Sequence, residues 1–479
     1  MINTDINGGI VMKDMTLEKI AAAVKGELHV EKIAQGIDAK TTEAAGVVLD
    51  SRKVETGYIF IATRGERVDG HNFIDSVFDA GAIGVICERA PEHPKGAYIL
   101  VKDSFQALKD VAEYYRSRLE IKVVGITGSV GKTSTKEFVA SVLSKQFRVV
   151  KTAGNFNNEV GLPLTVLGIR EDCEIAVLEM GISDFGEMHR LSKIARPDVC
   201  LITNIGQCHL ENLGTRDGIL KAKTEIFDYI QENGAICLNG DDDKLSTVQE
   251  VKGTVPVFFG TDINNAIYAT DYQNKGLEGS SAKIHINMNV AQADFDVAIP
   301  LPGEHMLYNA LAATAVGVQF GLSINQIREG IRDVEPVGGR SHVIHTDRLT
   351  LIDDCYNANP VSMKAALDLL AVTNTDDGKR RVAILGDMFE LGEKEKELHA
   401  EVGAYAAEKQ IDALICIGAL SQNMYDAAEK VENTTTKTYY FADKESMLGR
   451  LDELICDGDI VLVKASHGMH FEELLNELQ

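Results

Sequence analysis

The sequence has little positive charge, few cysteines and no long apolar run. Its 48 lysines and arginines are outnumbered by 72 aspartates and glutamates, and the net charge is −24. A nucleic-acid surface needs concentrated positive charge, so this balance argues against nucleic acid as a partner and suits small, locally neutralised ligands. An acidic chain that binds a polyanion must gather Lys and Arg at the site, so departures from the background are informative.

The 8 cysteines are scattered without CxxC pairs or metal-ligand spacing. At this chain length they indicate reduced thiols of a cytoplasmic protein rather than a disulfide framework. The first residues lack a basic segment followed by an apolar core, so no signal peptide is predicted. No stretch of 18 apolar residues occurs, so no membrane span is predicted. We therefore expect a cytoplasmic protein with no membrane partner, and a monomer.

The pattern of apolar strands predicts an α/β protein of three domains, which 479 residues can accommodate. Residues 1–110 are predicted to form a small α/β domain, because "GVVLDSRKVETGYIFIA", "GAIGVICE" and "AYILVK" alternate apolar strands with turn residues. Residues 336–479 begin within a segment with Pro and Gly, "DVEPVGGRSH", beyond which strands alternate with helical patterns. They are predicted to form a Rossmann-like domain.

Residues 111–335 are predicted to form a central domain built on a parallel sheet. Its strands "EIAVLEM" and "DVCLITNI" are continuous apolar runs, typical of strands buried on both faces. Between about 265 and 300 the sequence alternates with period two, which indicates antiparallel strands added to that sheet. No internal repeat or low-complexity segment is present.

A phosphate-binding loop is predicted where "GITGSVGKTSTK" follows the apolar run "IKVV". The segment fits G-x-x-x-x-G-K-[ST], in which small residues let backbone N–H groups face phosphate oxygens at a helix N-terminus. Lys132 is expected to reach the β- and γ-phosphates, and the Thr133 hydroxyl to ligate Mg²⁺. The residues expected to contact the nucleotide here are Gly128, Ser129, Gly131, Lys132, Thr133 and Ser134.

The nucleotide is predicted to be ATP. GTPases read guanine with an Asn-Lys-x-Asp segment, and the only "NK" dipeptide, Asn274-Lys275, is followed by "GL". A loop of this kind also needs a carboxylate to complete the Mg²⁺ shell. Glu179 ends the strand "EIAVLEM", at the edge of an open parallel sheet where ligands collect. A solvated strand end is the alternative for Glu179.

His209 and two lysines follow the next strand. His209 is predicted at a similar height to Glu179, but an ordinary loop histidine remains the alternative, since Mg²⁺ prefers oxygen ligands. Lys221 and Lys223 lie two apart on a predicted helix and cannot share a face, so at most one points at the phosphates. By composition alone, both are better read as solvated helix charges.

Motifs along nearly the whole chain resemble the Mur ligase superfamily of ATP-dependent amide-forming enzymes, and within it the MurF branch. The quoted stretches are "DSR" and "TRGERVDGHNFI" in the first domain; "TGSVGKTSTK", "TAGNFNNEVGLPLT", "LEMG", "TNIGQCHLENLG", "KAKTEIF" and "GEHMLYNALAA" in the central one; and "GGRSHV", "IDDCYNANPVSM" and "ILGDMFELG" in the third. The stretches "YNANPVSM" and "NFNNEVGLPLT" are similar to the MurF branch in particular.

The resemblance implies a ligase that joins D-alanyl-D-alanine to UDP-N-acetylmuramoyl-tripeptide through an acyl phosphate, in the peptidoglycan precursor synthesis that supports cell shape and division. It implies two Mg²⁺ ions, one held by Thr133 and Glu179 and a second assisted by His209. It also implies that Lys223 reacts with CO₂ to become a carbamate, an anionic oxygen ligand. Lys132, Glu179, His209 and Lys223 are the catalytic residues that it implies.

The resemblance also implies where the substrates bind. Asn309 would lie near adenine, and Arg340 and Asp354 would contact phosphate and ribose. Further substrate-binding residues that it implies are Tyr356, Asn357 and Asn359 for D-Ala-D-Ala, Asn158 and Glu159 for the nucleotide-sugar side, and Ser51, Arg52, Asp69 and His71 for UDP. Without it, "DSRK" is an ordinary strand end with a solvated Arg, and "YNANP" is a turn.

Two stretches depart from the family pattern. Ser134 replaces a common Thr and keeps the hydroxyl, whereas Ala465 and His467 stand where the family usually has Gly and Arg. A histidine can bind a carboxylate only when protonated or as a neutral donor, so this departure bears on substrate affinity or pH optimum rather than on fold. The third residue of the tripeptide, diaminopimelate or lysine, stays open. Alternatives for the function are a folylpolyglutamate synthase-like ligase and a P-loop nucleotide-binding protein or kinase that is not a ligase.

Overall fold

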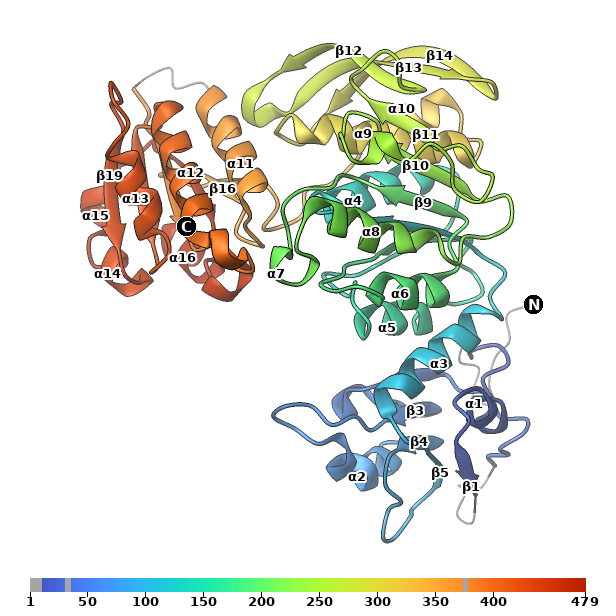
Figure 1. Cartoon of the computed structure of the whole chain (residues 1–479). Helices are drawn as coiled ribbons and strands as arrows, with labels where there is room; N and C mark the ends of the chain where they lie inside the picture. The colour runs from blue at the N-terminus through green and yellow to red at the C-terminus, as the bar shows by residue number, and fades with distance from the viewer. Residues whose placement is uncertain (1–10, 31–35, 374–377) are drawn as a thin grey trace.

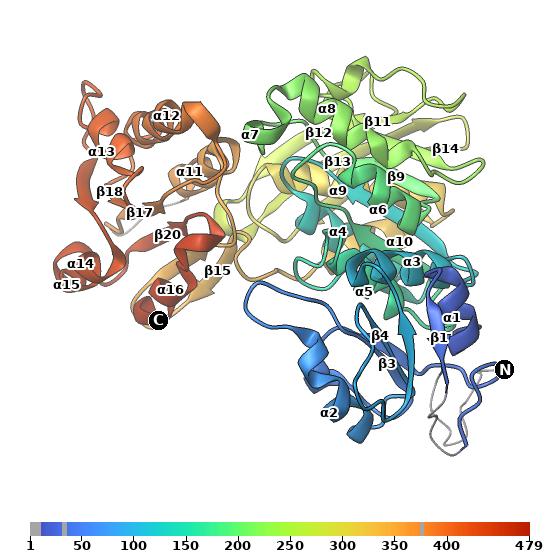
Figure 2. The same ribbon diagram turned by 60° about the horizontal axis from the view of Figure 1, so that its bottom comes forward.

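The computed structural model describes residues 11–30, 36–373 and 378–479. In these ranges the chain forms three α/β units, each built on its own sheet, in the order predicted (Figure 1). The central unit lies between the other two, with the third unit on one side and the first unit on another (Figures 1 and 2). The predicted class, three α/β domains with a parallel central sheet and added antiparallel strands, is confirmed.

The first unit contains a five-stranded sheet in the order β1-β5-β4-β3-β2. Strands β2 to β5 run parallel, and β1 pairs antiparallel with β5. The strands predicted from the sequence are therefore present. The elements are α1 (Leu17–Ala23), β1 (Glu27–His29), β2 (Gly46–Val48), β3 (Tyr58–Ile61), α2 (Ile74–Asp79), β4 (Gly84–Cys87) and β5 (Ala97–Leu100).

Helix α3 (Ser104–Arg116) joins the first unit to the central one. It begins where the Asp103 side chain accepts a hydrogen bond from the Gln106 N–H at 2.9 Å, an N-cap that satisfies a free helix donor. Its apolar side packs against helices of both units. The boundary predicted between residues 110 and 111 lies inside this helix, and the domain limits stay a prediction.

The central unit contains a nine-stranded sheet in the order β14-β13-β12-β11-β10-β9-β6-β8-β7. Pairing is parallel from β7 to β12, while β12–β13 and β13–β14 pair antiparallel, as the period-two pattern predicted. The strands are β6 (Lys122–Thr127), β7 (Val149–Lys151), β8 (Ile175–Glu179), β9 (Val199–Ile202), β10 (Ala235–Asn239), β11 (Val257–Gly260), β12 (Ile267–Asn274), β13 (Ser280–Met288) and β14 (Ala291–Ile299).

Helices cover both faces of the central sheet, which explains its continuous apolar strands. On β6, Val123 packs with one cluster and Val124 with the other, because successive side chains point to opposite faces. One face carries α5 (Gly161–Leu167), α6 (Glu187–Ala195) and α8 (Arg216–Thr224), with the short α7 (Leu210–Leu213) before α8. The other carries α4 (Lys132–Leu143), α9 (His305–Gln319) and α10 (Ile324–Arg332).

The third unit contains a six-stranded sheet in the order β15-β16-β20-β17-β18-β19, parallel except for β15. Its strands are β15 (His342–His345), β16 (Thr350–Asp353), β17 (Arg381–Gly386), β18 (Ala413–Ile417), β19 (Lys437–Phe441) and β20 (Ile460–Lys464). Its helices are α11 (Pro360–Val372), α12 (Glu395–Glu408), α13 (Gln422–Ala428), α14 (Lys444–Leu448), α15 (Leu451–Leu454) and α16 (Glu472–Leu478). None of the helices in the described part of the chain has the length and apolar character needed to cross a membrane.

Candidate active site

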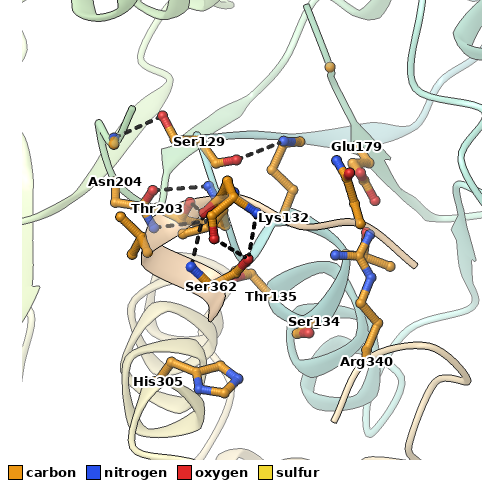
Figure 3. A pocket seen from close by; sticks show the side chains of 18 of the residues that line it. Ser129, Lys132, Ser134, Thr135, Glu179, Thr203, Asn204, His305, Arg340 and Ser362 are labelled. Carbon is orange, nitrogen blue, oxygen red and sulfur yellow. Dashed lines mark hydrogen bonds between the residues drawn. The ribbon is translucent and has the colours of Figure 1, made fainter. Parts of the chain in front are cut away.

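A cavity of about 950 Å³ lies between the central and third units (Figure 3). Its walls come from the loop before α4, the ends of β8 and β9, the start of α9, and the segments 340–341 and 354–366 of the third unit. The predicted residues that line it are Ser129, Gly131, Lys132, Thr133, Ser134, Asn158, Glu159, Glu179, His209, Asn309, Arg340, Asp354, Tyr356, Asn357 and Asn359.

The predicted phosphate loop connects β6 to α4, and residues at the end of the neighbouring strand β9 fix its conformation. Gly128 and Gly131 have positive φ angles of 153° and 80°, and a Cβ on Gly128 would lie 1.9 Å from the Thr203 hydroxyl oxygen. Asn204 accepts hydrogen bonds from Ser129 N and Val130 N, both at 3.0 Å. No side chain caps the N-terminus of α4, so its backbone N–H groups are available to an anion.

The two functional side chains at the start of α4 have partners within the protein. The Lys132 ammonium donates to the carbonyl oxygen of Gly128 at 2.9 Å, so it is turned back on its own loop. The Thr133 hydroxyl accepts a hydrogen bond of 3.1 Å from the guanidinium of Arg340, which reaches it from the third unit. A cation thus lies where the predicted metal and phosphates belong.

Glu179 ends β8 and is 2% exposed, so the alternative of a solvated strand end is wrong. Its Oε1 accepts a hydrogen bond from the Asn157 amide at 2.8 Å, whereas its Oε2 is buried without a hydrogen-bond partner. Lys136 lies 3.8 Å from Oε2, too far for a hydrogen bond. A buried carboxylate oxygen without a donor fits a divalent cation such as Mg²⁺, which takes oxygen ligands.

Lys221 and Lys223 point in different directions from α8. Lys221 is exposed and lies over the Phe185 ring at 5.8 Å. Lys223 is 1% exposed, so its reading as a solvated charge is wrong. Burial, with a smaller contribution from the charge of Lys132, lowers the pKa of Lys223 from its ordinary 10.5 to about 8. In the described ranges its ammonium has no hydrogen bond or ion pair, and this buried amine can become neutral near physiological pH.

His209 precedes α7 with a positive φ of 52° and pairs with the third unit rather than with Glu179. Its Nδ1 lies 2.7 Å from Glu390 Oε2, and this contact lowers the pKa of Glu390 although burial opposes it. The described residues contain no group of three or more His, Cys, Asp or Glu side chains placed to hold a metal. The predicted metal set of Thr133, Glu179, His209 and modified Lys223 therefore stays a prediction.

Arg340 is positioned by an aromatic ring of the third unit. Its guanidinium lies 4.0 Å from the centre of the Tyr356 ring, a cation–π contact that holds it toward Thr133. The Asp354 carboxylate accepts from Ser341 N at 3.0 Å through Oδ1 and from the Lys464 ammonium at 2.6 Å through Oδ2. Both oxygens of Asp354 are thus used inside the unit, and its predicted contact with ribose is untested.

The asparagines of the predicted dipeptide site shape the start of α11. Asn359 caps this helix, because its side chain accepts from Ser362 N at 2.9 Å and the Ser362 hydroxyl accepts from Asn359 N. The Asn357 carbonyl accepts from Lys464 at 3.0 Å. In "YNANP" the chain bends at Tyr356 and Pro360 opens α11, and Tyr356, Asn357 and Asn359 lie on the cavity wall.

Asn309 is buried on α9, where its Oδ1 accepts a hydrogen bond of 2.8 Å from the Thr135 hydroxyl. It therefore borders the cavity directly behind the phosphate loop. On the opposite wall, the Asn158 side chain accepts from Val160 N and Gly161 N at 3.1 and 2.9 Å and so positions the start of α5. Glu159 is bound by Arg190 and Lys109.

The four residues predicted to bind UDP lie in the first unit and do not line the cavity. Arg52, which follows Ser51, is exposed and bonds Asp50 through Nε at 2.9 Å and a terminal nitrogen at 2.8 Å. His71 is buried: its Nδ1 contacts Asp69 at 2.7 Å and its Nε2 accepts from Glu88 N at 2.9 Å. Both ring nitrogens of His71 therefore have partners within the protein.

The structure adds side chains to the site that the sequence reasoning missed. Lys136 is 1% exposed and donates to the Thr152 carbonyl at 2.8 Å beside Glu179. Its spacing of four from Lys132 on one helix was an available signal. Lys464 ends β20, and the strand-end rule that selected Glu179 applies equally to it. The missed residues are Lys136, Asn157, Arg216 and Lys464.

The C-terminal departures from the family pattern have different surroundings. Ala465 is fully buried, and its Cβ would lie 2.7 Å from a Cβ added to Gly386. His467 is exposed, and its ring centre lies 5.5 Å from that of Tyr356. His467 therefore borders the predicted dipeptide site.

Comparison with protein families gives three matches in chain order. The Mur ligase family catalytic domain matches residues 43–123, the Mur ligase middle domain residues 126–317, and the Mur ligase glutamate ligase domain residues 339–467. Two similar proteins named UDP-N-acetylmuramoyl-tripeptide–D-alanyl-D-alanine ligase come from Bacillus subtilis and Escherichia coli. They are 39% and 34% identical over 97% and 98% of this chain, and over 98% and 99% of their own length.

Solved structures that are similar to this chain also include proteins named MurF. MurF from Acinetobacter baumannii superposes with a TM-score of 0.88 at 32% identity, over 98% of this chain and 99% of its own. MurF ligase from Thermotoga maritima in complex with ADP has a TM-score of 0.78 at 31% identity, over 90% and 96%. Escherichia coli FolC, at 16% identity and a TM-score of 0.55, shares the fold alone.

Proposed function

The chain belongs to the Mur ligase family, and we propose that it joins D-alanyl-D-alanine to UDP-N-acetylmuramoyl-tripeptide with ATP, the reaction for which its full-length relatives are named. This activity belongs to peptidoglycan precursor synthesis. The observation that carries the proposal is a single cavity in which the phosphate loop of the central unit meets the 356–359 loop of the third unit. Phosphate and an incoming amine can therefore meet there.

The reaction is activation of a carboxylate. An amide does not form readily from a carboxylate and an amine at neutral pH, because the carboxylate has no adequate leaving group. A terminal oxygen of the tripeptide carboxylate attacks the γ-phosphorus of ATP, the bond to the bridging oxygen breaks, and ADP and an acyl phosphate form. The amine of D-Ala-D-Ala then attacks the acyl carbon, a proton is lost, and inorganic phosphate leaves.

The contribution of the protein is positioning and charge neutralisation, since two anions must approach each other. The free N–H groups at the start of α4 and the ammonium of Lys132 would bind the β- and γ-phosphates. Lys132 exchanges its carbonyl partners on the loop for phosphate oxygens. Arg340 already reaches the same point from the third unit and would add a second cation.

Mg²⁺ would be held by the Thr133 hydroxyl and by the free Oε2 of Glu179, and a second ion by His209 with modified Lys223. When bound, Mg²⁺ neutralises charge on the phosphates. Asn157 orients Glu179 through Oε1 and leaves Oε2 toward the cavity. For His209 to take part, its ion pair with Glu390 must open.

Lys223 is proposed to carry a carbamate. A neutral amine adds to CO₂ and releases one proton, which replaces a cation by an anion with two oxygens. The lowered pKa of about 8 supplies the neutral amine, and burial protects the product from exchange with solvent. In the described ranges this ammonium has no hydrogen bond or ion pair that the modification would break.

The three units divide the substrates. Ser51, Arg52, Asp69 and His71 of the first unit would bind UDP, with the planar guanidinium of Arg52 suited to pyrophosphate oxygens. Asn309 would lie beside adenine, and Tyr356, Asn357 and Asn359 beside D-Ala-D-Ala. Closing of the third unit over the cavity would exclude water from the acyl phosphate. We take residues 1–110, 111–335 and 336–479 as working domain limits and a monomer as the working state.

The proposal is tested by phosphate release from ATP in the presence of UDP-MurNAc-tripeptide, with and without D-Ala-D-Ala. The ligase requires both substrates for sustained release. Release that ignores the dipeptide would instead favour a P-loop nucleotide-binding protein or kinase. Release that responds to glutamate and a folate would favour a folylpolyglutamate synthase-like reaction.

A further inference from the structure

Three charged side chains meet at the edge of the cavity that faces the first unit. Glu159 Oε1 accepts from Arg190 Nε at 2.5 Å and lies 3.2 Å from the Lys109 ammonium, and Oε2 accepts from a terminal nitrogen of Arg190 at 3.0 Å. Arg190 lies on α6 and Lys109 on α3, while Glu159 precedes α5. We name Lys109, Glu159 and Arg190 the Glu159 cluster.

The Glu159 cluster has one more cation than anion, in a chain with a net charge of −24. The hydrogen bonds from Arg190 lower the pKa of Glu159, so its carboxylate is ionised and the charges of the three cluster side chains sum to +1. The charges of Glu187 and Glu225 also act on Arg190. In the described ranges the second terminal nitrogen of Arg190 has no acceptor, and Lys109 uses one of its three donors. The cluster therefore retains donors and charge for an additional anion.

The cluster lies between the place where the reacting carboxylate of the proposed substrate would meet ATP and the first unit, where its UDP group would bind. Glu159 lines the cavity, and Asn157, two residues earlier, holds Glu179. Two residues span at most about 7 Å, so the cluster lies close to the place where the reacting carboxylate must meet ATP. Helices α3, α5 and α6 lie on the side of the central unit toward the first unit, where UDP would bind (Figure 1).

The peptide substrate offers suitable anions. One structural relative is named for UDP-N-acetylmuramoylalanyl-D-glutamyl-2,6-diaminopimelate as substrate. In such a peptide the glutamyl residue keeps one free carboxylate, and diaminopimelate keeps a second one after the first has reacted. The two carboxyl carbons of diaminopimelate are six bonds apart, at most about 8 Å, which is comparable with the span of about 7 Å at most between residues 157 and 159.

We propose that the Glu159 cluster binds a carboxylate of the peptide that does not react, through Arg190 and Lys109. The inference rests on the proposed function and adds to it the group that holds the middle of the substrate. The carboxylate has two possible sources, the second residue of the peptide or the side chain of the third. A lysine in third place lacks the second of these carboxylates, so paired substrates distinguish the sources.

The test uses the full-length variants Arg190→Gln and Lys109→Gln with two substrates, the diaminopimelate tripeptide and the lysine tripeptide. Lys193→Gln is the matched control, because Lys193 on α6 pairs with Glu113 on α3 at 2.9 Å and so joins the same two helices. Steady-state KM and kcat are measured. Binding of each UDP-tripeptide without ATP is measured by calorimetry, and thermal unfolding reports on folding.

We expect KM and the calorimetric Kd to rise about tenfold in Arg190→Gln and in Lys109→Gln, which is the loss of one charge-assisted hydrogen bond at a partly exposed site. We expect kcat to stay within about twofold, and Lys193→Gln to match the wild type. A rise for both tripeptides assigns the second-residue carboxylate. A rise for the diaminopimelate tripeptide alone assigns the third-residue side chain.

Unchanged binding in both cluster variants would overturn the inference. So would an equal rise in Lys193→Gln, because the cluster would then act by joining helices. If the wild type binds the tripeptides but releases no phosphate in response to D-Ala-D-Ala, the proposed function fails and this inference fails with it. If the wild type turns over normally and the KM and Kd of the two cluster variants are unchanged, this inference is rejected and the proposed function stands.

Discussion

The cavity of the central unit and the predicted UDP residues of the first unit differ in how their polar groups are partnered. Glu179 Oε2 on the cavity wall and the ammonium of Lys223, which is buried and does not line the cavity, have no hydrogen-bond partners in the described ranges. In the first unit, Arg52 bonds Asp50 through Nε and one terminal nitrogen, and both ring nitrogens of His71 have partners within the protein. A buried charged group without a hydrogen bond is costly even where a cation lies nearby, as Lys136 does at 3.8 Å from Glu179 Oε2. Glu179 and Lys223 are therefore the groups that a ligand would complete, whereas His71 already has both of its partners.

This difference predicts which residues act in the chemical step and which act only in substrate binding. Glu179 would bind a cation and Lys223 would react with CO₂, and both would act in the transition state. Their loss would therefore lower kcat. Groups that are already satisfied and exposed can only add to substrate binding, so their loss would raise KM. Four predictions, ordered from the largest expected effect to the smallest, test this division and the burial of Lys223 on which it depends.

Lys132→Ala is expected to lower kcat/KM by roughly 10³-fold, because one preorganised cation at the transferred phosphoryl group is lost. The measurement is phosphate release with both peptide substrates present. Circular dichroism controls for folding. Near-normal turnover in a correctly folded Lys132→Ala protein would contradict the assignment of chemistry to the cavity.

Lys223→Ala is expected to lower kcat by at least about 10²-fold, since the anionic ligand that replaces the buried amine cannot form. Added bicarbonate is expected to stimulate the wild type at pH 7, where the amine with a pKa of about 8 is mainly protonated, and to leave the variant unchanged. Lys221→Ala, on the exposed side of the same helix, is the matched control. Equal losses in the two variants would show that position on the helix does not matter.

Lys223 also predicts a pH dependence of stability in CO₂-free buffer. Its folded pKa of about 8 lies below the unfolded 10.5, so the unfolded state binds the proton more tightly and the free energy of unfolding rises with pH between about 8 and 10.5. The rise is about 3 kcal/mol for this group. Urea unfolding of the wild type and Lys223→Met at pH 7 and 10 measures it. A wild-type rise no larger than that of Lys223→Met would contradict the burial of a charged amine.

Arg52→Ala is expected to raise KM for the UDP-tripeptide about tenfold with little change in kcat, because an exposed guanidinium adds binding to pyrophosphate and no chemistry. Lys53→Ala, beside it in the sequence, controls for net charge. Initial rates at several UDP-tripeptide concentrations separate the two parameters. A collapse of kcat with unchanged KM would remove the distinction between the two regions.

The residues that could be predicted from the sequence belong to contiguous or periodic patterns. The phosphate loop, helix α4 and the position of Glu179 at a strand end follow from local spacing and from the rule that ligands collect at the carboxyl ends of parallel strands. The separation of Lys221 from Lys223 follows from helix geometry, although which of the two is buried does not.

The remaining contacts depend on long-range packing. Three such contacts join residues that are far apart in the sequence. Asn157 and Glu179 are 22 positions apart, Arg340 and Thr133 are 207 apart, and His209 and Glu390 are 181 apart. No local pattern predicts such pairs, because the first needs the central sheet to assemble and the other two form only when the central and third units come together. For the same reason α3 bridges two units across a boundary that composition placed within it.

The central claim is that the peptide carboxylate becomes an acyl phosphate in this cavity. Oxygen-18 placed in the terminal carboxylate of the UDP-tripeptide tests it directly, with mass analysis of the inorganic phosphate released during D-Ala-D-Ala addition. The account predicts one oxygen-18 atom in each phosphate released. Product formation with phosphate that carries no oxygen-18 would contradict it.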